Sequence, residues 1–136
     1  MPRPVPHDDL VAALREQDPA AVPGADVVAQ LALAVAAAPV PDRTALKIAV
    51  RALAQRVADR VPGRTVELRV PPFAAVQCVA GPRHTRGTPP NVVEVDAAAF
   101  VALCTGRLGW AAAERDGRLR ASGERAAALQ EVLPLL

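Results

Sequence analysis

Residues 96–123 read DAAAFVALCTGRLGWAAAERDGRLRASG, and this stretch decides the fold. Asp96 is a favoured helix N-cap residue, and the apolar residues behind it predict a helix that buries Phe100 and extends to about Cys104. Gly106 can adopt the left-handed conformation that commonly ends a helix. The stretch therefore opens with one short, largely apolar helix and a turn.

The sequence predicts further helices and strands both before and after this helix. The Ala-rich residues 111–115 predict a second helical turn, and Asp116-Gly117 is a turn signal. Residues 118–122 then favour a strand, and residues 124–132 a closing helix. On the N-terminal side, the sequence NVVEV at residues 91–95 favours another strand. Strands and helices thus alternate over this third of the chain.

Two more strands are expected upstream of the decisive stretch. Residues 65–70 alternate between apolar and polar side chains, which is typical of a strand with one solvated face. Pro71-Pro72 interrupts the alternation, and residues 73–80 predict the second strand. Residues 81–90 are polar and rich in Pro and Gly, which predicts a loop.

The first part of the chain is helical by pattern. Asp8 or Asp9 is expected to cap a helix to about Gln17. Asp26 is expected to open a second helix to about Ala38, and Asp42 to cap the longest helix, to about Val61. We therefore predict an α+β fold in a single domain, residues 1–136, with a small mixed β-sheet covered by helices. Residues 1–62 form a helical lead-in, and residues 63–136 form the strand–helix part.

Composition and charge narrow the function classes. The formal net charge is only +2 over 136 residues, and no block of like charges indicates a nucleic-acid partner. The longest apolar run, residues 31–40, is too short to span a membrane, so integral insertion is not expected, although transient membrane contact is compatible with the sequence. The N-terminus lacks a signal-peptide pattern, and Cys78 and Cys104 fit a reducing compartment, so we predict a cytoplasmic protein.

The decisive stretch resembles the sterol-carrier-protein-like family. Residues 70–78 and the segment 86–91 resemble the small stand-alone bacterial (actinobacterial) type of that family. The resemblance is carried by Asp96, by the spacing Leu103-x-x-Gly106-x-Leu108, by Gly117-x-Leu119-x-x-x-Gly123 and by the closing leucines up to Leu136. The resemblance implies a sheet covered by helices around an apolar ligand cavity. The long helical lead-in departs from the general family pattern.

The resemblance implies that apolar side chains between sheet and helices line the cavity. Our candidates for this lining are Val70, Phe73, Val76, Leu103, Leu108, Trp110, Leu129 and Leu133, with Val66 and Leu68 as further candidates. Each of them is also a plausible ordinary core residue. The abundant Ala and Val leave either room for a ligand or close packing without room.

A polar cluster near the strand at residues 91–95 is the candidate headgroup site. It comprises Arg83, His84, Arg86 and Asn91, in which arginine can grip a phosphate or carboxylate through two hydrogen bonds. The alternative is a solvated loop whose arginines pair with Glu94 or Glu67. His84 has no orienting partner or nucleophile that can be assigned, so we predict no catalytic residues and no enzyme.

No cofactor or metal is expected from the motifs. The cysteines and histidines lack metal-ligand spacing, and no nucleotide-binding fingerprint is present.

The principal hypothesis is a non-enzymatic binder or carrier of a lipid or similar apolar small molecule. One alternative is an accessory module for a partner enzyme of the thiol-dependent isomerase or transferase type. The other is a structural homodimer with a sealed core, joined through the apolar helix at residues 26–38.

Overall fold

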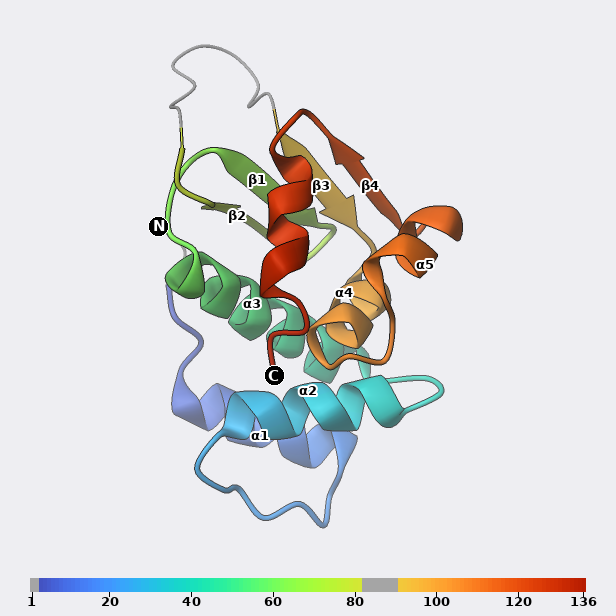
Figure 1. Ribbon diagram of the computed structural model, residues 1–136. Helices are drawn as coiled ribbons and strands as arrows, with labels where there is room; N and C mark the ends of the chain where they lie inside the picture. Colours follow the sequence, from blue (N-terminus) through green and yellow to red (C-terminus); the bar gives the residue numbers. More distant parts are fainter. Residues whose placement is uncertain (1–2, 82–90) are drawn as a thin grey trace.

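The computed structural model describes residues 3–81 and 91–136. Within these ranges, Figure 1 shows three levels: the sheet above, one long helix below it, and a pair of helices at the bottom. In chain order the elements are α1 (His7–Gln17), α2 (Val27–Ala37), α3 (Arg43–Arg60), β1 (Val66–Val70), β2 (Ala74–Cys78), β3 (Val92–Val95), α4 (Ala97–Cys104), α5 (Trp110–Arg115), β4 (Leu119–Ser122) and the 3-10 helix η1 (Ala126–Val132). The predicted α+β class is confirmed.

Aspartate caps begin three of the helices at the predicted residues. The side chains of Asp26, Asp42 and Asp96 accept backbone N–H groups at the starts of α2, α3 and α4. Helix α1 ends at Gln17, as predicted, but the predicted cap was wrong, because Pro6 occupies the N-cap and no side chain caps the helix. Asp8 and Asp9 lie instead within the first turn, where their charges favour the helix dipole.

The sheet is mixed, as predicted, and has the strand order β2-β1-β3-β4 in the described residues. β1 pairs antiparallel with β2 and parallel with β3, and β3 pairs antiparallel with β4. Alternation along the strands separates two faces. The inner face carries the buried side chains, which are Val66, Leu68, Val70, Val76, Cys78, Val93, Val95 and Leu119.

The other face of the sheet is open and polar. It carries Glu67, Arg69, Ala75, Gln77, Glu94, Arg120 and Ser122, which are exposed or half-buried. Arg69 Nε lies 2.7 Å from Glu67 Oε1, and this carboxylate, with a smaller effect of Glu94, raises the pKa of Arg69. The helices of the described residues therefore cover one face, as expected from the solvated alternation of residues 65–70.

Helix α2 packs inside its own domain. Val27, Leu31, Ala32 and Val35 are buried, and α2 contacts α1, α3 and α4. Its apolar character is therefore accounted for within the chain, which removes the reason for expecting a homodimer through it. Leu33 is its one large apolar side chain among the exposed residues described, at 50% exposure.

The C-terminal helix differs from the prediction. Residues 126–132 form a 3-10 helix instead of an α-helix that starts at Glu124. A 3-10 helix rises about 2.0 Å per residue against about 1.5 Å for an α-helix, so the same residues span a longer distance. This extension carries the chain from the end of β4 back to α4, where Leu135 N donates to Cys104 O.

Candidate functional site

An apolar space lies between the inner face of the sheet, α3, α4, α5 and η1. Its lining residues share an apolar side chain, and they are Val57, Leu68, Val93, Val95, Phe100, Leu103, Trp110, Leu119, Leu129 and Leu133. The void that they leave is only about 10 Å³, which is roughly the space of one water probe. A pocket for a small-molecule ligand has about 300–1,000 Å³. We call this region the interior space; it is closed in this structure.

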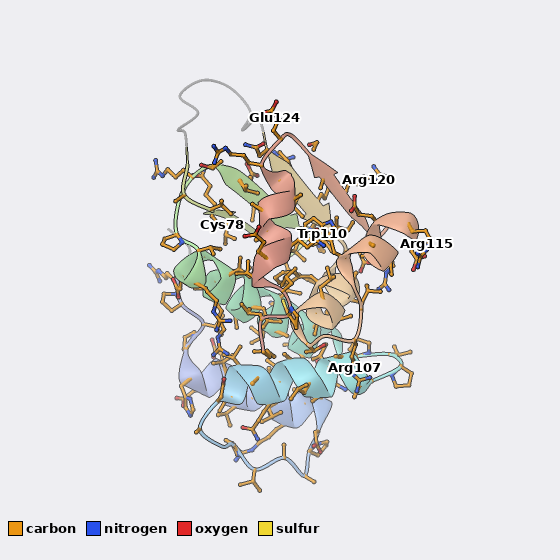
Figure 2. The ribbon with its side chains drawn as sticks, viewed as in Figure 1. Cys78, Arg107, Trp110, Arg115, Arg120 and Glu124 are labelled. Carbon is orange, nitrogen blue, oxygen red and sulfur yellow. The ribbon has the colours of Figure 1, made fainter. Side chains whose placement is uncertain are left out.

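Four of the eight predicted lining residues meet around the interior space: Leu103, Trp110, Leu129 and Leu133. Leu68, a further candidate, also lies there. Trp110, the first residue of α5, is buried beside η1, whereas Arg107, Arg115 and Arg120 are exposed (Figure 2). Sequence reasoning missed Val57, Val93, Val95, Phe100 and Leu119. Strand alternation could have found the three on β3 and β4, because it puts them on the face of Leu68.

The structure places the other four predicted lining residues elsewhere. Val70 and Val76 belong to the core but do not line the interior space. Phe73 is half-buried beside α3, with its ring centroid 5.2 Å from Arg43 Cζ. Leu108 is half-buried in the turn after α4, where its N–H donates to Ala102 O. Their apolar character reflects packing at other places in the fold.

Asn91 has a structural position. It is 6% exposed; its Nδ2 donates to Thr65 O at 3.0 Å, and its Oδ1 accepts from Arg125 N at 2.9 Å. Both amide atoms are thus engaged with backbone groups of the protein, which argues against the headgroup role predicted for Asn91. The other members of that cluster, Arg83, His84 and Arg86, lie outside the described residues.

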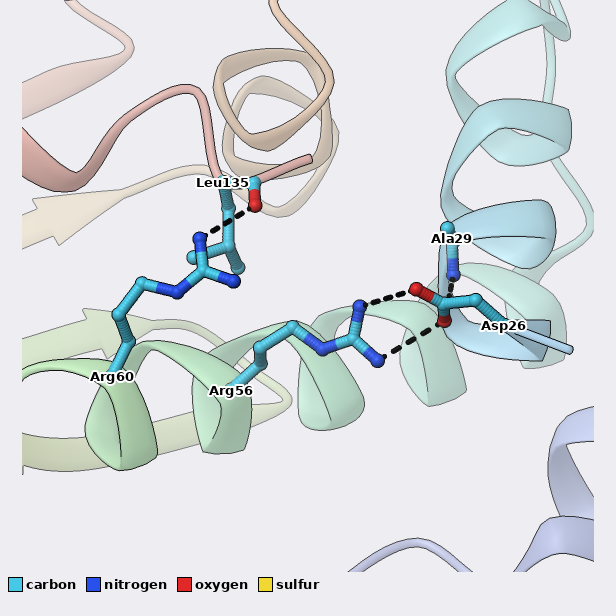
Figure 3. A network of polar contacts seen from close by, with 5 residues as sticks. All are labelled: Asp26, Ala29, Arg56, Arg60 and Leu135. Carbon is cyan, nitrogen blue, oxygen red and sulfur yellow. Dashed lines mark hydrogen bonds and ion pairs between the residues drawn. The ribbon is translucent and has the colours of Figure 1, made fainter.

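One wall of the interior space is the C-terminal segment, which we define as residues 126–136. Ala126, Leu129 and Leu135 are at most 3% exposed. The beginning of this wall is tied to Asn91 through Arg125, and its end is tied to Cys104 O by the N–H groups of Leu135 and Leu136. Arg60 Nη1 also donates to Leu135 O at 2.8 Å (Figure 3).

Helix α3 holds the start of α2 by a contact one turn before Arg60. Arg56 binds both carboxylate oxygens of Asp26, each at 3.1 Å, while Asp26 accepts from Ala29 N (Figure 3). The hydrogen bond from Arg56 and then the backbone N–H of Ala29 lower the pKa of Asp26. One helix therefore anchors both α2 and the C-terminal segment.

The chemistry of the interior space is apolar. Burial raises the pKa of the Cys78 thiol to about 11 and that of the Cys104 thiol to about 12, so neither is an activated nucleophile at neutral pH. Residues 3–81 and 91–136 contain no cluster of three metal-ligating side chains. No helix in the same ranges has the length and apolar character to cross a membrane.

Comparison with known protein families gives a match that covers most of the chain. The family model described as bacterial SCP ortholog matches residues 42–135, from the N-cap of α3 to the C-terminal segment. No curated protein matches the chain. Helices α1 and α2 lie before the matched region, so the expected departure of the lead-in from the family pattern holds for them. It does not hold for α3, which also belongs to the lead-in but lies within the match.

Proposed function

This chain belongs to the bacterial SCP ortholog family, of the sterol-carrier-protein-like kind that its sequence resembles, and from this premise we propose that it binds a lipid or similar apolar molecule without catalysis. The observation that supports the proposal is the interior space, whose ten described lining residues are all apolar. An apolar ligand would find no buried polar group there that loses a hydrogen bond on binding.

Binding requires the interior space to expand, and the C-terminal segment is the wall that can move. The sheet and α3 are held by neighbours on several sides, whereas residues 126–132 of this segment form a 3-10 helix, with poorer hydrogen-bond geometry. Outward movement would break the contacts of Leu135 with Arg60 and Cys104. Local opening of this kind is drawn from the least stable parts of a fold.

The free energy gained by burying a long apolar ligand can exceed the cost of exposing the leucines of the C-terminal segment. Exposing a buried leucine costs about 1.5–3 kcal/mol, so releasing Leu129, Leu133 and Leu135 costs about 5–9 kcal/mol. A ligand gains about 0.8 kcal/mol for each buried methylene, so a chain of about fifteen carbons gains roughly 12 kcal/mol. A long acyl chain or sterol-sized ligand can therefore displace the segment, whereas a small apolar solute cannot.

Trp110 provides a direct test, because it lines the interior space and is the single tryptophan of the chain. A conjugated polyene fatty acid absorbs where tryptophan emits, so a bound probe should quench Trp110 by energy transfer. We expect saturable quenching that an unlabelled fatty acid reverses, and none in Trp110→Phe. Native mass spectrometry of the gently purified protein should show the bound mass.

The proposal has a clear negative outcome. If neither a fatty acid, a fatty acyl-CoA nor a sterol produced saturable quenching, and the native mass was that of the bare chain, lipid binding would be rejected. The probe should be titrated up to hundreds of micromolar, because a gain of about 12 kcal/mol less a cost of about 5–9 kcal/mol leaves about 3–7 kcal/mol for binding.

A further inference from the structure

A groove runs along the outer edge of the sheet between β2 and α3. Two adjoining hollows of about 370 and 560 Å³ form it, and both are lined by Gln55, Ala75 and Val76. We call it the β2–α3 groove. Its remaining lining residues are Arg3, Arg51, Ala54, Ala58, Asp59, Pro62, Gly63, Arg64, Phe73, Ala74 and Gln77. The groove is separate from the interior space, with which it shares no lining residue.

The groove lies against the edge of β2 and not against one face. Ala75 and Gln77 have exposed side chains on the open face of the sheet, whereas Val76 is buried on the inner face. A hollow that touches residues of both faces must pass along the strand edge. β2 is the terminal strand of the sheet in the described residues, so no further described strand lies beyond it.

The register shows which backbone groups face this edge. Glu67 N donates to Asn91 O, so the odd-numbered residues of β1 direct their backbone groups toward β3 and the even-numbered ones toward β2. In β2 the partners of these even-numbered residues are Ala74, Val76 and Cys78. The N–H and C=O groups of Ala75 and Gln77 therefore point outward, into the groove.

The groove suits an added strand. Its floor and sides carry small side chains at Ala54, Ala58 and Ala75, which leave room for a backbone about 4.8 Å from β2. At the junction of the two hollows, Gln55 Oε1 is buried without a hydrogen-bond partner among the described residues. An N–H group of an added strand is the kind of donor that this acceptor lacks.

The charged side chains that line the groove favour an added strand with acidic side chains. The lining holds three guanidinium groups, Arg3, Arg51 and Arg64, against one carboxylate, Asp59, which already accepts from Gln55 Nε2 at 2.9 Å. Arg51 and Arg64 lie at opposite ends of the groove, and Arg51 is positioned by its hydrogen bond to Phe73 O. Carboxylates on an extended segment would meet a guanidinium at each end.

We propose that the β2–α3 groove binds an extended, carboxylate-bearing segment of a partner protein, which adds to β2 as an edge strand. Backbone hydrogen bonds at Ala75 and Gln77 provide the affinity, and the arginines provide the preference for acidic side chains. A second copy of the chain is less favoured as the occupant, because its own groove arginines would face the same positive charge.

The test uses the full chain and a short capped peptide in which glutamate alternates with valine. Its matched probe replaces glutamate by lysine. We expect saturable amide shifts at Ala75, Gln77, Arg51 and Arg64 in two-dimensional NMR spectra with the acidic peptide alone. Trp110 should be unaffected, so this result is independent of lipid binding.

Gln77→Pro tests the pairing itself. The N–H of Gln77 points outward, so proline removes a donor from the groove without breaking a bond to β1, and edge strands tolerate it. We expect affinity for the acidic peptide to fall by about tenfold or more. Ala121→Pro is the matched control, because Ala121 faces the opposite free edge, on β4, and should leave affinity unchanged.

Three results would overturn the proposal. The first is equal binding of the lysine peptide, and the second is undiminished binding by Gln77→Pro that has folded normally. The third is concentration-dependent shifts at Ala75 and Gln77 in the absence of peptide, which would assign the edge to a second copy. The wild-type NMR map remains decisive if the proline variant fails to fold.

Discussion

Asn91 joins three segments of the chain through one buried amide. It links the start of β1, the start of β3 and the residue before η1, by hydrogen bonds of 3.0 and 2.9 Å. In the sequence Asn91 is close to Arg83, His84 and Arg86, and for this reason we predicted that it binds a ligand headgroup. Its burial instead makes it a connector between the sheet and the C-terminal segment.

We predict that Asn91→Ala destabilises the protein by about 2–3 kcal/mol, because two buried hydrogen bonds are lost. Urea denaturation measures this free energy. Gln130→Ala removes an exposed amide from η1 and should cost about 0.5 kcal/mol or less. Equal effects of the two substitutions would contradict the structural role of Asn91.

The pair of Asp26 and Arg56 should make stability depend on pH. The pKa of Asp26 is lowered in the folded state, so its contribution is complete above the unfolded pKa, near 3.8, and is lost as the pH falls through the folded value. Asp26→Asn keeps an N-cap residue but removes the charge. We expect its deficit to be under about 1 kcal/mol at pH 7, because the Asp26 side chain is 51% exposed.

Denaturation across pH measures that difference. The deficit of Asp26→Asn should be constant above about pH 5 and shrink toward pH 2. Arg56→Met should reduce this pH dependence, since it removes the main cause of the lowered pKa, while the backbone N–H of Ala29 still lowers it. A deficit that stayed constant down to pH 2 would mean that the charge of Asp26 contributes nothing.

At the scale of elements, the C-terminal segment determines whether the interior space is open. Its last residues are held by Arg60 from α3 and by Cys104 O from α4. Cys104 is buried, and its backbone C=O accepts hydrogen bonds from the C-terminal segment. Cys78 is also buried, but it belongs to β2. The two cysteines therefore provide a probe of segment opening and an internal reference.

We predict that Arg60→Ala accelerates labelling of Cys104 by a thiol reagent by about fivefold, because one lost hydrogen bond shifts the opening equilibrium by about 1 kcal/mol. Labelling of Cys78 should be unchanged, and both thiols should react slowly in the native protein because burial raises their pKa. Mass spectrometry of the labelled peptides separates the two sites. Arg107→Ala, which removes another exposed arginine, serves as the control, and equal acceleration of both cysteines would indicate global loosening.

At the scale of the molecule, helix α3 of the lead-in contacts both α1 and α2 on one side and β2 and α4 of the strand–helix part on the other. α1 and α2 both contact α3, and α2 also contacts α4, although the family match begins at residue 42. Their buried residues, Leu10, Ala13, Leu14, Val27, Leu31, Ala32 and Val35, belong to the same hydrophobic cluster as the inner face of the sheet. We therefore propose that residues 1–136 form one domain.

This proposal predicts a single unfolding transition in urea. Far-UV circular dichroism reports mainly the helices, including α1 and α2, whereas Trp110 fluorescence reports the strand–helix part. The two curves should coincide, as expected for one cooperative unit. Earlier loss of helical signal, with Trp110 still in its native environment, would show that the lead-in unfolds by itself.

The sequence by itself determined the features that depend on neighbouring residues. Aspartate caps, Gly and Pro turns and the alternation of residues 65–70 are local signals, and they placed α2, α3, α4 and the strands within one or two residues. The order of motifs from Asp96 onward also indicated the family correctly. Phe73 and Leu108 show the limit, because apolar character alone does not state which part of the core a side chain enters.

Tertiary structure decided the features that depend on distant residues. Whether the interior space is open or filled depends on a few ångströms of packing between Val57, Phe100 and Leu129, which come from three different elements. The burial of Asn91 and the free edge of β2 follow likewise from which strands and helices become neighbours. Packing volume and edge exposure are properties of the assembled elements, so no local pattern in the sequence encodes them.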